Sequence, residues 1–176
     1  MRVLLDACVL YPTIQREIFV AVAARGDFVP LWSERILEEW ARAALRAGPD
    51  VGAQARVEIA LLRDRFPNGC VAAPVRDDLD LPDPDDVHVL SAAIEGQADM
   101  IVTRNLKDFP NRILARENLY AIGPDPFFLA CHAERSLAEP VEEVRARTQA
   151  ISGREQVVRP LLKRAGLPRL GKALSE

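Results

Sequence analysis

Short, uninterrupted apolar runs alternate with longer helical patterns through the first two-thirds of this 176-residue chain. The apolar runs predict strands at 3–5, 28–32, 70–73, 100–103 and 120–122. The patterns between them predict helices at 14–25, 33–47, 51–65 and 85–96. Because strands that alternate with helices favour a parallel sheet covered on both faces, the expected fold class is α/β with a central parallel sheet.

The turn-forming segment from Gly123 to Pro126 marks a predicted boundary. Helical patterns follow it at about 127–136, 140–151 and 155–165, and the last residues, 168–176, are expected to be loosely held. We therefore expect two parts, an α/β domain over 1–122 and a small helical C-terminal extension over 126–176.

Composition excludes several classes of protein. Apolar residues make up 49% of the chain, which argues against disorder. No stretch has the length of a membrane span and no signal-peptide pattern opens the chain, so a cytoplasmic protein is expected. The three cysteines are far apart and form no CxxC pair, so we expect small buried apolar side chains rather than zinc ligands or disulfides.

Charge is distributed unevenly along the chain. Residues 1–125 carry 20 acidic and 14 basic groups, whereas residues 126–176 carry 6 acidic and 9 basic groups. A basic flank would help an acidic site to approach RNA, although an asymmetry this mild also occurs without any function.

Polar side chains follow two of the predicted strands. Asp6 comes directly after the first strand, and Asn105 and Asp108 come after Thr103 at the end of the fourth. Ligands of parallel sheets bind at the carboxyl ends of strands, and oxygen ligands suit Mg²⁺ or Mn²⁺. Such a cation suits phosphodiester chemistry. The alternatives are a turn or N-cap role for Asp6, and for Asp108 a cap of the turn at 109–110.

Helical geometry separates the acids that open the helix predicted at 85–96. At 100° per residue, Asp86 shares the inward stripe with Leu90, four residues later. Asp83 and Asp85 lie off that stripe and suit helix caps or outer positions. Asp86 is therefore the candidate ligand.

The same geometry separates two neighbouring glutamates. In the helix that Ser33 is expected to cap, Glu39 lies at the edge of the apolar stripe, and Glu38 faces solvent. We therefore take Glu39 as the candidate for the site. His88 and His132 are expected to be surface groups, which argues against a histidine general base.

These motifs resemble those of the PIN-domain nucleases, and within them the VapC-like toxins of bacterial toxin–antitoxin pairs. The resemblance covers residues 1 to about 122, and its segments are Leu4–Leu10, Ser33–Trp40, Asp83–Ala93 and Ile101–Phe109. It implies a three-layer α/β/α fold and a Mg²⁺- or Mn²⁺-dependent endoribonuclease that hydrolyses RNA phosphodiester bonds. The C-terminal extension resembles that of one VapC-like branch.

The resemblance assigns roles to the acidic residues. The first three acids of the family correspond to Asp6, Glu39 and Asp86, and the usual position of the fourth holds Asn105. Asp108 stands where some branches carry the next acid. Asp6 and Asp86 would hold the principal ion, with Asp108 or Asn105 completing its ligands, and Glu39 would position or deprotonate water.

Three further residues follow the fourth strand. Arg104 and Lys107 could clamp a phosphate, with solvated surface charge as the alternative, and Thr103 is a further candidate for substrate binding. Hydrolysis at a site of this kind should leave a 5′-phosphate and a 3′-hydroxyl.

The expected partners are RNA, a cognate antitoxin protein and a second copy of the chain in a homodimer. One alternative is a housekeeping PIN ribonuclease for RNA maturation, which needs no inhibitor. Another is a catalytically inactive PIN module that only binds RNA or protein. Asn105 favours the inactive module, and the intact Asp6, Glu39 and Asp86 oppose it.

Overall fold

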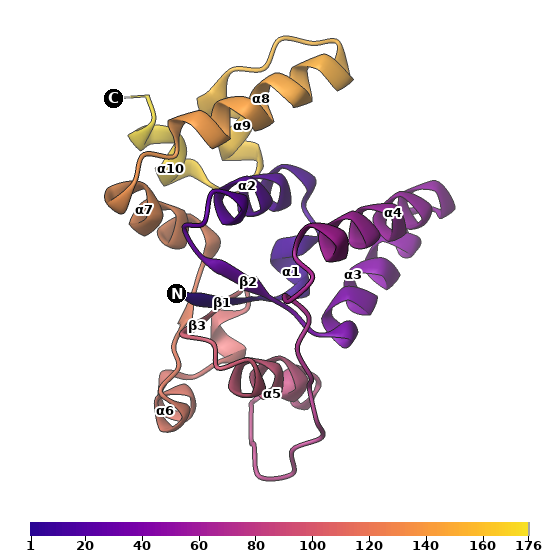
Figure 1. The fold of residues 1–176 in the computed structure, drawn as a ribbon, viewed down its shortest axis with the longest axis vertical. Helices are drawn as coiled ribbons and strands as arrows, with labels where there is room; N and C mark the ends of the chain where they lie inside the picture. The colour runs from indigo at the N-terminus through magenta and orange to yellow at the C-terminus, as the bar shows by residue number, and fades with distance from the viewer. Residues whose placement is uncertain (176) are drawn as a thin grey trace. The chain divides into compact units, whose positions relative to one another are not determined.

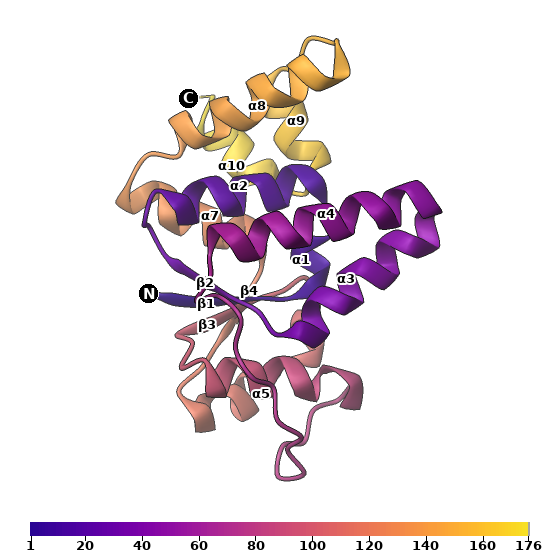
Figure 2. The same ribbon diagram turned by 45° about the vertical axis from the view of Figure 1, so that its right-hand side comes forward.

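The computed structural model describes residues 1–175, in which four strands form one parallel sheet of order β2-β1-β3-β4 (Figures 1 and 2). The strands are β1 (Arg2–Leu5), β2 (Val29–Leu31), β3 (Met100–Val102) and β4 (Ala121–Ile122). Leu4 of β1 lies opposite Leu31 on one side and Ile101 on the other. The predicted α/β class with a central parallel sheet is confirmed.

The central strands are buried, as their continuous apolar sequence predicts. Val3, Leu4 and Leu5 of β1 are almost fully shielded from solvent, and so are Ile101 and Val102 of β3. Burial on both faces removes the alternation of apolar and polar residues that a half-exposed strand would show.

The strand predicted at 70–73 is wrong. Only a single bridge, between Trp32 and Cys70, extends the sheet there. The amide of Trp32 donates to the carbonyl of Gly69, and the amide of Val71 donates to the carbonyl of Trp32, after which the chain leaves the sheet. A Cβ on Gly69 would lie 2.5 Å from the Trp32 ring, so this close approach requires glycine.

The first of two compact units comprises residues Met1–Tyr11 and Phe28–Ile122. Its α-helices are α1 (Ala7–Leu10), α3 (Glu34–Ala47), α4 (Pro49–Arg65), α5 (Val87–Glu95) and α6 (Asn111–Leu114). Its 3-10 turns are η1 (Pro84–Asp86), η2 (Leu106–Asp108) and η3 (Ala115–Glu117). Ser33 caps α3 as predicted, because its Oγ accepts the amide of Ile36 at 3.3 Å. Helices α3 and α4 pack side by side (Figure 2).

The second unit comprises Pro12–Asp27 and the chain from Gly123 onward. Its helices are α2 (Thr13–Ala24), α7 (Pro124–Glu134), α8 (Ala138–Ser152), α9 (Val158–Arg164) and α10 (Pro168–Ala173). The ring of Phe19 in α2 packs on those of Phe127 and Phe128, with centroids 5.6 and 4.4 Å away. The division predicted at residue 122 stays a prediction.

The expectation of a loosely held tail is wrong for 168–175, and Glu176 lies outside the described residues. Helix α10 forms there, and Leu170 is fully buried. The carboxylate of Asp125 accepts the amides of Arg169 and Leu170 at 3.0 Å each, and so caps the first turn of the helix. Within residues 1–175, no helix is long and apolar enough to cross a membrane.

Candidate active site

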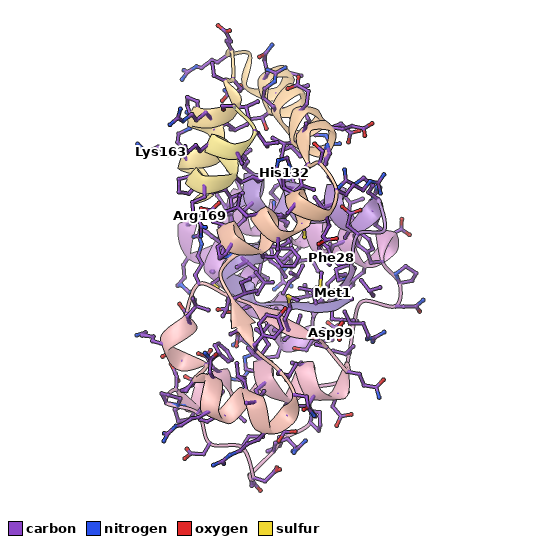
Figure 3. The ribbon with its side chains drawn as sticks, turned by 90° about the vertical axis from the view of Figure 1, so that its left-hand side faces the viewer. Met1, Phe28, Asp99, His132, Lys163 and Arg169 are labelled. Atoms are coloured by element: carbon purple, nitrogen blue, oxygen red, sulfur yellow. The ribbon has the colours of Figure 1, made fainter. Side chains whose placement is uncertain are left out.

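The candidate site lies at the carboxyl edge of the sheet. Met1, Phe28 and Asp99, labelled in Figure 3, precede β1, β2 and β3 and mark the opposite, amino edge. Asp6 directly follows β1, and Thr103 directly follows β3. Because β1 and β3 are parallel neighbours, the ends of these two strands bring the two side chains together.

Asp6 is held by hydrogen bonds in a buried position. It is 5% exposed, and its amide donates to the carbonyl of Val102, which extends the pairing of β1 with β3 by one residue. Its Oδ2 accepts the hydroxyl of Thr103 at 2.7 Å and the thiol of Cys8 at 3.1 Å. A buried carboxylate requires such donors, so Thr103 and Cys8 fix the direction of the Asp6 side chain.

Cys8 is a neutral donor rather than a thiolate. Burial, together with the negative charge of Asp6, raises the pKa of the Cys8 thiol to about 12. Its sulfur also accepts the amide of Arg104 at 3.2 Å. The expectation of buried, apolar cysteines holds for Cys131, but Cys8 is half-buried and Cys70 is exposed, because both contact carboxylates rather than a core.

Asp86 lies between η1 and α5, where it is half-buried beside other acids. Burial, together with the negative charges of Asp6, Asp83 and Asp108, raises the pKa of Asp86 to about 6. The structure therefore brings Asp6 and Asp108 within electrostatic reach of Asp86. Asp83 is a cap as predicted, since its Oδ1 accepts the amide of Asp85 at 2.9 Å.

Glu39 projects from α3 toward α5, in contact with two basic side chains. Its Oε1 lies 2.8 Å from Nε2 of His88 and 3.3 Å from Nε of Arg35. Burial disfavours the charged form, but the interactions with His88 and Arg35 outweigh it and lower the pKa of Glu39. Glu38 instead pairs with Arg42 at the surface, as its predicted solvent-facing position requires.

The prediction that His88 is a surface group is wrong. His88 is 6% exposed, and within residues 1–175 neither ring nitrogen has a well-aligned hydrogen-bond partner, although Nε2 lies within ion-pair distance of Glu39. The prediction from helical periodicity failed because the middle of α5 is buried on every side: the six consecutive residues from His88 to Ala93 are all buried. Only the position of α3 reveals that His88 faces Glu39.

The remaining residues that were predicted for the site lie in the segment after β3. The side chains of Arg104, Asn105 and Lys107 are exposed, and that of Asp108 is half-buried. The amide of Asn105 donates to Thr103 Oγ1 at 3.0 Å, so the segment is anchored to the hydroxyl that holds Asp6. Asp108 ends η2 and does not cap α6, whose N-cap is Pro110.

The chemistry of the donor set fits a hard divalent cation. Within residues 1–175, no three acidic, histidine or cysteine side chains are close enough to form a ready-made metal site. Mg²⁺, however, keeps several waters and often takes only one or two protein carboxylates. Burial and then the charges of the nearby acids disfavour the ionised form of Asp86, and a cation beside Asp6 and Asp86 would favour that form.

Comparisons with known proteins agree with this geometry. Residues 2–107, more than half of the chain, match a family model described as PIN domain. A stretch of 44 residues is 48% identical to a protein of Mycobacterium tuberculosis (strain ATCC 25618 / H37Rv) named "Putative ribonuclease VapC50". This stretch covers 25% of the chain and spans only 26% of that relative's length. No solved structure matches the chain at a significant level.

Proposed function

The chain belongs to the PIN domain family, and from this premise we propose that it is a metal-dependent endoribonuclease, the toxin of a toxin–antitoxin pair. The observation that carries the proposal is the buried Asp6 at the carboxyl edge of a parallel sheet, close enough to Asp86 that its charge adds to burial in raising the pKa of Asp86. A site of this charge favours a cation over a neutral ligand. The name of the Mycobacterium tuberculosis relative agrees with a ribonuclease.

Asp6 and Asp86 are the proposed principal ligands of Mg²⁺ or Mn²⁺, and Asp108 and Asn105 would complete the ligand set. A bound divalent cation would activate water for attack and neutralise charge that develops on the phosphate. Thr103 and Cys8 would position Asp6 for this purpose, because both donate hydrogen bonds to one of its carboxylate oxygens. Asn105 contributes no charge, so Asp108 would supply the fourth acid.

Glu39 is the proposed group that orients and deprotonates the attacking water. A base must be ionised before it accepts a proton, and the lowered pKa of Glu39 keeps the carboxylate charged at neutral pH. His88 and Arg35 act as positioning residues, since both contact the same oxygen of Glu39. The exposed Arg104 and Lys107 would contact phosphates of the RNA. The expected products carry a 5′-phosphate and a 3′-hydroxyl.

A toxin of this kind would act on cytoplasmic RNA and be inhibited by a cognate antitoxin, and we propose that it forms a homodimer. Induced expression in a bacterial host tests this. Wild-type protein should arrest growth, whereas Asp86→Asn should not, and the exposed Asp64→Asn variant should behave like the wild type. Release of the arrest by a small neighbouring gene would identify the antitoxin.

Normal growth during expression of soluble wild-type protein would contradict the toxin assignment and favour a housekeeping ribonuclease. A second candidate, a PIN module that binds RNA without cleaving it, is favoured by the exposed amide of Asn105 where an acid is usual in the family. RNA binding without cleavage in Mn²⁺ would support that module.

A further inference from the structure

A pocket of about 510 Å³ adjoins the candidate active site without being part of the assigned chemistry. Arg35 of α3 forms one side of it, and Val87 and His88 at the start of α5 form another. The loop between the bridge at Cys70 and η1 closes the pocket with Val75 and Arg76. Its size lies within the range that protein pockets for small ligands occupy.

Two of the lining residues also contact the proposed base. Arg35 Nε lies 3.3 Å from Glu39 Oε1, and its Nη2 approaches the carbonyl of Asp85 at 3.4 Å. His88 Nε2 contacts the same Glu39 oxygen at 2.8 Å. A group in the pocket would therefore lie next to the carboxylate that handles the attacking water.

The loop that closes the pocket is held at both sides of its apolar tip. Ser91 is buried in α5, and its hydroxyl donates to the carbonyl of Pro74 at 2.7 Å. The guanidinium of Arg76 donates to both carboxylate oxygens of Asp78, at 2.7 and 2.6 Å, which fixes the plane of the group. Between these anchors, Val75 is 92% exposed, and so an apolar side chain is presented to solvent at the pocket.

We propose that this pocket binds one nucleotide of single-stranded RNA, the one next to the phosphate that is cleaved. The inference rests on the proposed function and deepens it by naming a subsite. Arg35 would contact the phosphate of this nucleotide, since guanidinium groups bind phosphate in a bidentate manner. The fixed plane of Arg76 and the apolar Val75 would contact the base face.

An acidic residue in the pocket lining favours a base over a second phosphate as the group bound there. Asp77 also lines the pocket, and a carboxylate repels phosphate but accepts hydrogen bonds from the amino groups of adenine, cytosine or guanine. The pocket therefore selects among bases, whereas Arg104 and Lys107 would contact the backbone without regard to sequence. Selection at this position should appear as a base preference beside the cleavage site.

The test measures binding and cleavage separately. Fluorescent single-stranded RNA oligonucleotides of uniform sequence, each made of one base, are titrated with wild-type protein in EDTA, where no hydrolysis occurs. Arg76→Ala and Val75→Asp should each raise the Kd about tenfold for the preferred base and less for the others. In Mn²⁺, the same variants should lose base preference at the mapped cleavage sites.

Matched controls come from positions that do not line the pocket. Arg145 pairs with both oxygens of Glu142 as Arg76 does with those of Asp78, so Arg145→Ala removes an equivalent pair elsewhere. Val57→Asp places the same charge at an exposed valine of α4. Both controls should leave the Kd unchanged, and circular dichroism should show that every variant melts like the wild type.

Two results would overturn the subsite. The first is that Arg76→Ala and Val75→Asp bind RNA with the wild-type Kd and cleave at the wild-type sequence. The second is that the control variants lose as much RNA affinity as these two variants do. Weakened binding of the antitoxin with unchanged RNA binding would assign the pocket to the protein partner instead. Tight, base-selective RNA binding by a wild-type protein that cleaves nothing would contradict the endoribonuclease and leave the subsite standing.

Discussion

Asp6 shows how individual side chains prepare this site. Its Oδ2 receives two donors, the Thr103 hydroxyl and the Cys8 thiol, both of which are neutral. Neutral donors hold a buried carboxylate in place without cancelling its charge, so that its attraction for a cation persists. Asp86, in contrast, has no side-chain capping hydrogen bond at the start of α5, and the neighbouring charges act on it directly.

Asp86→Asn should stabilise the metal-free protein at neutral pH. The pKa of Asp86 is raised to about 6, above its ordinary value of 3.8, so the folded state binds this proton more tightly than the unfolded state. Stability therefore falls as pH rises from about 4 to 6 and stays lower above that. Because the side chain is half-exposed, the expected gain at pH 7 is only about 1 kcal/mol.

Urea unfolding in EDTA at pH 3.5 and pH 7 measures this effect, with Asp64→Asn as the control. The gain of Asp86→Asn should largely disappear at the lower pH, where the folded state holds the proton and the unfolded state is mostly protonated. Added Mn²⁺ should reverse the order, raising the melting temperature of the wild type more than that of Asp86→Asn. An equal gain at both pH values would contradict the raised pKa of Asp86.

His88 should matter for catalysis only through Glu39. The amide nitrogen of His88→Gln can take the place of Nε2, so this variant should keep most of the kcat. His88→Asn and His88→Leu should lose about tenfold in kcat with little change in KM, because neither reaches Glu39. In a Glu39→Gln background, His88→Leu should cost almost nothing more.

Steady-state cleavage of a fluorogenic RNA measures these effects, and His132→Gln is the matched control. A further loss from His88→Leu in the Glu39→Gln protein would show that His88 acts independently of Glu39.

Sequence reasoning located acids but not the groups that hold them. Asp6 and Thr103 could be predicted because they end apolar strands, and the half-buried Glu39 agrees with the edge of the stripe on which it was placed. His88 and Glu39 are 49 residues apart in the sequence and lie on different helices, so the periodicity of either helix could not predict their contact. The hydrogen bond from Cys8 to Asp6 likewise depends on the start of α1, which turns the Cys8 side chain back toward Asp6.

At the scale of elements, the order of strands and helices could be predicted from the sequence. The secondary structure of two segments could not. Cys70–Ala73 has the composition of a strand, but its backbone pairs with the sheet only at the bridge between Cys70 and Trp32. Helix α10 was missed because it has only six residues and includes Gly171, and so short a segment does not form a stable helix in isolation. Buried leucines and a cap from α7 stabilise it instead.

Asp125→Ala should destabilise the protein by about 1 to 3 kcal/mol, because the change leaves two amides at the start of α10 without their acceptor. Asp125→Asn should cost less, since it keeps one of the two oxygens. Chemical denaturation measures both, and Asp64→Ala at an exposed site of α4 should change stability by less than about 0.5 kcal/mol. Equal stability of Asp125→Ala and wild type would contradict the capping role.

At the scale of the whole molecule, contacts link α2 to the C-terminal helices. Helix α2 packs against α8, and Phe19 packs on two rings of α7. Sequence alone suggested a boundary near residue 122, because a turn-forming segment there follows the last strand. Periodicity cannot show that a helix near the N-terminus packs on helices more than 100 residues later.

A chain that ends at residue 122 should therefore be far less stable than the whole protein. It would leave α2 without α7 and α8, and exposure of Phe19 alone should cost about 3 kcal/mol. Thermal unfolding followed by circular dichroism tests this, with Phe19→Ala in the full chain as the companion variant. A cooperative melt of the shortened chain at the wild-type temperature would instead support an independent 1–122 domain.

The central claim is metal-dependent RNA hydrolysis that requires Asp86. It is tested most directly by incubating pooled cellular RNA with wild-type and Asp86→Asn protein, in Mn²⁺ and in EDTA, and mapping the new 5′ ends. Discrete 5′-phosphate ends that appear only with wild-type protein and Mn²⁺ are the predicted result. Ends that persist in EDTA or with Asp86→Asn, or wild-type protein that binds RNA and never cuts it, would contradict the claim.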